Sequence, residues 1–152
     1  MWFIAITLQV ILSFSATSLS LPPAQKEGRF SAAGLDDDRE VEQFFTSFKE
    51  AIAKGDKKKV ASLVSYPIRV NLVSGRRTKL KNAHDFIGTY DRIFDDQFKQ
   101  LILGTDVKDL WAKWSGVATP SGELWFSGIV LDPKHPEKYT IKIITINGPV
   151  RS

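Results

Sequence analysis

The side chains best suited to acid–base chemistry gather in one short stretch, at His84, Asp85, Tyr90 and Asp91. A histidine oriented by a carboxylate can take up a proton at neutral pH, and a buried carboxyl group can donate one. These residues are therefore the catalytic candidates. We favour a structural interpretation, because His84 and Asp85 fall in the first turn of a predicted helix, where aspartate caps the helix and histidine is exposed.

Metal and thiol chemistry find little support. The chain has no cysteine, which excludes disulfides, thiolate zinc sites and a cysteine nucleophile. Its two histidines, His84 and His135, have no carboxylate cluster between them that points to both. The sequence contains no glycine-rich phosphate loop, nucleophile elbow or metalloprotease motif. We expect no metal and no cofactor.

Large aromatic side chains offer a second kind of site. Tryptophan and tyrosine rings can line a pocket for an apolar or sugar-like ligand, or form a protein-binding face. The same rings can fill the core between a sheet and a helix, which is the interpretation we favour for most of them. The candidate ligand-binding residues are Tyr66, Tyr90, Trp111, Trp114 and Trp125.

The chain has a modest excess of basic residues. Its 21 Lys and Arg against 17 Asp and Glu give a formal net charge of +4. Nucleic-acid binders carry a denser basic stripe with interleaved aromatics, so no nucleic-acid partner is expected. Two basic clusters could meet an anionic partner or a lipid surface, although solvated surface charge is the commoner explanation. They are Lys54 with Lys57–Lys59, and Arg76, Arg77, Lys79 and Lys81.

The first 20 residues have the pattern of an export signal. They contain no charged side chain, and an apolar run from Trp2 to Leu12 gives way to small and polar residues. This predicts a signal peptide over residues 1–20, cleaved near Ser18 or Ser20. Only the terminal amine supplies positive charge, so an uncleaved anchor is the alternative. We expect a periplasmic or secreted protein that meets a membrane only through this segment, if it is left uncleaved.

Residues 21–37 mix Pro, Gly, Ala and charge without periodicity, which predicts a flexible linker before a domain at residues 38–148. Apolar residues at helical spacing from Val41 to Ile52 predict a first helix, with an N-cap among Asp36 to Asp38 and an end at Gly55. A short second helix capped by Asp56 follows.

Beyond Pro67 the hydrophobic period changes to two and predicts a strand pair that turns at Ser74–Gly75. Asn82, with Asp85, is expected to cap helical sequence that extends to Gly104. Strands are expected in the last third, at residues 107–114, 115–119, 123–131 and 139–146. Helices followed by a run of antiparallel strands predict an α+β fold.

The segment GVATPSGELWF contains a predicted turn at Pro120–Gly122. In the strand that follows, Trp125 lies on one face while Leu124 and Phe126 lie on the other. Alternation cannot bury all three on one side. Either Trp125 or the pair Leu124 and Phe126 therefore lines the more open face.

The order of elements, with the segments YPIRV, FIGTYDRIF and GELWFSGIV, resembles the nuclear transport factor 2-like superfamily, and most closely its small uncharacterised exported bacterial members. The resemblance implies a curved antiparallel sheet wrapped around the N-terminal helices into a cone. The superfamily includes enzymes, such as ketosteroid isomerases and polyketide cyclases, that carry acidic or hydroxyl groups inside the cone. The resemblance therefore implies that a catalytic member would have such groups there. Here Phe44, Phe45 and Phe48 occupy the inner stripe of the first helix, which counts against isomerase-type catalysis.

We therefore expect an exported, non-catalytic binding or assembly domain that uses the mouth of the cone or the open sheet face. The expected partner is a small apolar ligand or another protein, and the resemblance implies homodimerisation through the sheet. The alternative is a small enzyme of the same fold, with isomerase-, cyclase- or dehydratase-like acid–base chemistry on an apolar substrate and Tyr90 or Asp91 at the mouth.

Overall fold

The computed structural model describes residues 28–72 and 74–148. The predicted signal peptide at 1–20 and residues 21–27 of the predicted linker lie outside this part of the chain. None of the helices it contains combines the length and apolar character that crossing a membrane requires. The elements are η1 (Ser31–Ala33), α1 (Asp38–Lys54), α2 (Lys57–Ser62), β1 (Val64–Asn71), β2 (Arg77–Leu80), α3 (Ala83–Ile93), α4 (Asp96–Gly104), η2 (Val107–Asp109), β3 (Trp111–Lys113), β4 (Gly116–Ala118), β5 (Leu124–Val130) and β6 (Tyr139–Asn147).

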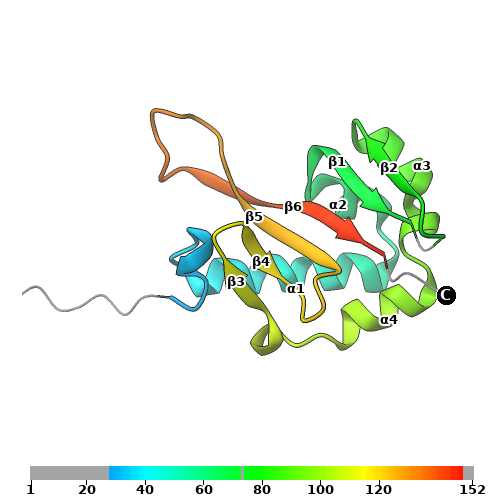
Figure 1. Ribbon diagram of the computed structural model, residues 1–152, viewed down its shortest axis with the longest axis horizontal. Coiled ribbons are helices and arrows are strands. Elements are labelled where there is room, and N and C mark those ends of the chain that lie inside the picture. The colour runs from blue at the N-terminus through cyan, green and yellow to red at the C-terminus, as the bar shows by residue number, and fades with distance from the viewer. Residues whose placement is uncertain (1–27, 73, 149–152) are drawn as a thin grey trace, which may run out of the picture.

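The predicted α+β class is confirmed: helices and one curved, unclosed sheet of six strands form two layers, with α1 lying across one face of the sheet (Figure 1). The strand order is β2-β1-β6-β5-β4-β3. A wholly antiparallel sheet was the wrong prediction, because β6 runs parallel to β1 and only the other pairs are antiparallel. Alternation along a strand indicates which side chains share a face, but it carries no information about the neighbouring strand or its direction.

Local signals place most helix ends where the sequence predicts them. Asp37 caps α1 by accepting from the Arg39 backbone N–H, and Asp56 caps α2 through the Lys59 N–H. Gly55 ends α1 with a left-handed φ of 64°, which glycine adopts without steric cost. The predicted helical sequence up to Gly104 divides into α3 and α4, and Asp95 caps the second of these helices.

Aromatic side chains fill the space between α1 and the sheet. The Phe45 ring stacks on Phe126 of β5 with 6.1 Å between centroids, and Phe48 packs against Phe94 at the end of α3. Phe94 in turn stacks on Phe98 of α4 at 5.4 Å. All five rings are fully buried, so this layer of the molecule is a packed core.

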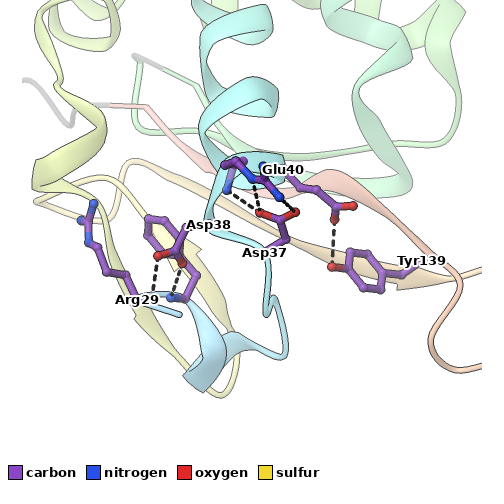
Figure 2. A network of polar contacts seen from close by, with 7 residues as sticks. Arg29, Asp37, Asp38, Glu40 and Tyr139 are labelled. Atoms are coloured by element: carbon purple, nitrogen blue, oxygen red, sulfur yellow. Dashed lines mark hydrogen bonds and ion pairs between the residues drawn. The ribbon is translucent and has the colours of Figure 1, made fainter. Parts of the chain in front are cut away.

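The folded domain begins earlier than the sequence indicates. Phe30 and Leu35, within the predicted linker, are 0% and 1% exposed and belong to the core. The Asp38 carboxylate accepts from the backbone N–H groups of Arg29 and Phe30, which fixes the segment to the start of α1 (Figure 2). Two isolated apolar residues in a turn and a 3₁₀ helix produce no periodicity, so this packing has no signal in the sequence pattern.

Two further contacts hold this end of the molecule together. The Arg29 guanidinium donates to the backbone carbonyls of Val107, Lys108 and Leu110, which ties the N-terminal segment to η2 and to the residue that follows it. The Tyr139 hydroxyl donates to the Glu40 carboxylate at 2.9 Å and joins β6 to α1 (Figure 2).

Replacing Phe30 with alanine should lower the free energy of unfolding by about 3–5 kcal/mol, because the change removes a fully buried aromatic ring and leaves a cavity. Urea denaturation followed by circular dichroism would measure it. The matched control is Ala32→Ser at a neighbouring exposed position, which should leave stability nearly unchanged. Equal stability of Phe30→Ala and the natural chain would show that residues 28–37 are a linker after all.

Candidate ligand-binding surface

Three of the four catalytic candidates, His84, Asp85 and Asp91, do not converge in an apolar pocket. His84 is exposed in the first turn of α3. Asp85 serves the start of the same helix, since its N–H donates to Asn82 Oδ1 and its carboxylate accepts from the Lys81 N–H. Asp91, also exposed, forms a surface ion pair with Lys57 at 2.6 Å. Each carboxylate thus has a structural partner.

Of the five aromatic candidates, Tyr90 belongs to the core and the half-buried Tyr66 packs against it. The Tyr66 hydroxyl donates to the Ala61 carbonyl at 2.9 Å, and its ring meets Phe86 edge-on. Tyr90 is 1% exposed and packs between Phe86 and Phe94; its hydroxyl has no hydrogen-bond partner within the described residues. Burial raises the pKa of both hydroxyl groups to about 12.

A polar hollow lies on the face of the sheet opposite the helices. Ile68, Val70 and Leu72 of the β1 region are buried toward the helices, and Arg69 and Asn71 alternate to the other side. The strand register sets Arg69 between Lys79 of β2 and Thr145 of β6, and Asn71 between Arg77 and Asn147. The hollow is open and has a volume of about 610 Å³. Its lining is Arg69, Asn71, Arg77, Thr78, Lys79, Thr145 and Asn147.

Hydrogen bonds connect this hollow to the turn between β4 and β5. The Asn71 side-chain amide donates to Asn147 Oδ1 at 2.9 Å, and the Asn147 amide donates to the Gly122 carbonyl at 2.9 Å. The same carbonyl accepts from Trp125 Nε1 at 3.1 Å. A continuous line of polar contacts therefore orients both asparagines and the Trp125 indole.

The predicted turn at Pro120–Gly122 is confirmed, and it holds both indoles in place. The Gly122 N–H donates to the Thr119 carbonyl at 2.9 Å, and Gly122 has a φ of 78°, in the region that favours glycine. The Thr119 hydroxyl donates to Glu123 and accepts from the Leu124 N–H. The Thr119 carbonyl also accepts from Trp111 Nε1 at 3.0 Å. Trp111 and Trp125 therefore each donate to a backbone carbonyl of the same turn.

Trp111 and Trp125 form an edge-to-face pair with centroids 5.1 Å apart, and the Lys113 ammonium lies 4.6 Å from the Trp125 ring centroid. Trp125 stands opposite Thr145 in the β5–β6 register, so it shares the face of the hollow, while Leu124 and Phe126 are buried in the core. This decides between the two orientations that alternation left open.

A second, smaller hollow of about 220 Å³ adjoins the first, and Thr145 lines both. Its other lining residues are Lys113, Ser115, Trp125 and Ile144. The Ser115 hydroxyl oxygen is buried there without a hydrogen-bond partner in the described chain. Trp114, in the turn between β3 and β4, is 88% exposed and forms no ring contact among the described residues. Of the five aromatic candidates, Trp111 and Trp125 are thus the two that meet.

Sequence patterns alone did not identify the hollow. Alternation does place Arg69 and Asn71 on one face of a strand, and Arg77 and Lys79 were noted as a basic cluster. Thr145 and Asn147 carry no comparable signal, because they reach this position only through the pairing of β6 with β1.

In the described ranges, no three or more His, Cys, Asp or Glu side chains lie close enough together to hold a metal ion. No protein-family model, no curated protein and no solved structure matches this chain.

Tyrosine ionisation should be delayed in the folded protein. Burial, together with the Glu40 hydrogen bond at Tyr139, raises the pKa of Tyr66, Tyr90 and Tyr139 from 10.0 to about 12. The folded state keeps these protons longer than the unfolded state does. The resulting stabilisation is therefore complete below pH 10 and is lost as the pH rises toward 12.

Ultraviolet absorbance of tyrosinate would measure this titration, with the urea-unfolded chain as the reference. We expect a titration midpoint higher in the folded than in the unfolded chain. Coincident curves would contradict the burial of Tyr66 and Tyr90.

Proposed function

We propose that this protein is a non-catalytic binding module whose binding surface is the helix-free face of its sheet. The observation that carries the proposal is the hydrogen-bonded line from Asn71 through Asn147 and Gly122 to Trp125. It fixes polar groups of the hollow and an indole ring on one face before any ligand binds. Such pre-organisation lowers the entropic cost of binding.

The arrangement of the titratable groups supports binding over the enzyme alternative. Acid–base catalysis needs at least two titratable groups that converge in one pocket. Asp85 and Asp91 are engaged in helix capping and a surface ion pair, and His84 is exposed. The buried Tyr90 has a pKa of about 12, which is poorly matched to proton transfer near neutral pH.

We also propose that the fold belongs to the nuclear transport factor 2-like group. The element order and the curved sheet around α1 are compatible with such a cone. The enzymes of this superfamily, such as ketosteroid isomerases, carry polar groups inside the cone. Phe45 and Phe48 occupy this space here, which supports a binding member rather than a catalytic one.

A ligand screen would test the binding surface. Saccharides, nucleotides and peptides of neutral, negative and positive charge would be screened against the full chain by ligand-observed magnetic resonance. Asn147→Ala and Trp125→Ala should each weaken the binding of a true ligand by about fivefold or more, since each removes a hydrogen bond that orders the surface. His84→Ala and Asp91→Asn are the controls and should leave affinity unchanged.

Circular dichroism would verify that the variants remain folded. A ligand that responds only to the His84 and Asp91 variants, or that is chemically converted during the measurement, would favour the enzyme.

Export is proposed from the uncharged apolar run between Trp2 and Leu12. Production of the full chain in a Gram-negative host, followed by N-terminal sequencing of the periplasmic fraction, should give a chain that begins at Leu19 or Leu21. A membrane-bound chain that begins at Met1 would indicate the uncleaved anchor instead.

A further inference from the structure

We propose that the hollow on the helix-free face binds an acidic polysaccharide, and that Arg69, Arg77 and Lys79 hold its carboxylate groups. The assignment rests on the proposed function and names the class of ligand for the same surface. Unpaired charge, the chemistry of the lining and the shape of the surface each support it.

The positive charge of the hollow is not neutralised. Arg69 and Lys79 stand directly opposite each other in the β1–β2 register, an arrangement of like charges that destabilises a strand pair. Within the described residues, no ion pair or hydrogen bond engages the Arg69, Arg77 or Lys79 side chain, and the lining holds no carboxylate. A bound anion would relieve this repulsion.

The lining fits a carboxylated sugar. A guanidinium group presents parallel N–H donors that match the two oxygens of a carboxylate. Around the cations, Asn71, Asn147 and Thr145 supply amide and hydroxyl groups that both donate and accept, as sugar hydroxyl groups require. The hydrogen bond between the two asparagines leaves one amide proton of Asn71 and the second lone pair of Asn147 Oδ1 for a ligand.

The shape favours a polymer over a small ion. The hollow extends over three adjacent strands, β2, β1 and β6. Because neighbouring strands lie about 5 Å apart, the lining side chains of one strand are about 5 Å from those of the next. Through Thr145 it continues into the smaller hollow beside Trp125 and Lys113. A chain of sugar units fits along this path with its acid groups at the cations.

Other occupants fit less well. In a two-fold symmetric dimer the same patch faces itself, so Arg69, Arg77 and Lys79 would oppose their own copies. Single-stranded nucleic acid binds by stacking bases on free ring faces. Here Trp111 and Trp125 pack edge-to-face and the Lys113 ammonium lies over the Trp125 ring, so the pair offers no stacking platform.

The test titrates the full chain with polygalacturonate and, separately, with the fully methyl-esterified polymer, which has the same backbone without charge. We expect the charged polymer to bind, the neutral one to remain unbound, and the affinity to fall as salt is added. Arg69→Ala and Arg77→Ala should each reduce affinity by about tenfold or more. Arg92→Ala and Lys58→Ala remove the same charge from exposed helical positions and should change it by less than about twofold.

Three outcomes would overturn the assignment. Equal losses in all four variants would mean that net charge alone attracts the polymer. Tighter Arg69-dependent binding of an oligothymidylate of equal charge would make nucleic acid the partner, and Arg69-dependent binding only to phosphatidylglycerol vesicles would make it a membrane.

The ligand class and the proposed function can fail separately. If polygalacturonate does not bind while a neutral compound from the ligand screen binds and responds to Asn147→Ala, the ligand class is wrong and the binding surface stands. If neither binds, both are wrong.

Discussion

The parallel pairing of β1 with β6 is the constraint on which the rest of the molecule depends. The last strand inserts between β1 and β5 and joins the β1–β2 hairpin to the three-stranded part formed by β3, β4 and β5. Backbone hydrogen bonds extend the pairing at both ends, from Ile143 to Leu63 and from Gly148 to Asn71. Without β6 in this position there would be two small sheets, neither with a continuous face, and Asn71 and Asn147 would not meet.

The two faces of this sheet have divided roles. The face toward α1 contributes Phe126 and other apolar side chains to an aromatic core that leaves Tyr90 buried among phenylalanines. Close packing of this kind stabilises the fold and leaves the space between α1 and the sheet filled by side chains. The opposite face carries the free cations and the paired indoles, and it is the face on which we propose that a ligand binds.

The turn at Thr119–Glu123 links these two roles. Thr119 is fully buried, yet its carbonyl accepts from Trp111, and the Gly122 carbonyl accepts from Trp125 and Asn147. One short connection thereby anchors the indole pair and one asparagine of the hollow to the core. The segment that the sequence predicts as a hairpin turn therefore positions the side chains of the proposed binding surface in the folded chain.

The features that the sequence predicts correctly are those that depend on near neighbours along the chain. Asp37, Asp56 and Asn82 cap their helices, and Gly55 and Gly122 allow a positive φ, because each of these effects involves only a few adjacent residues. Alternation likewise assigned side chains to opposite faces of each strand. It could not choose which face of β5 is buried, and it missed Phe30 and Leu35, whose burial follows no period.

Which strands lie side by side is set by long-range contacts that no local pattern of residues encodes. β1 and β6 lie far apart in the sequence, and their pairing is stabilised by the whole sheet and the core beneath it rather than by any local preference of either segment. The row formed by Lys79, Arg69, Thr145 and Trp125 exists because of that pairing. The sequence thus predicts which residue types alternate along each strand. Their assembly on one surface is a consequence of long-range strand register.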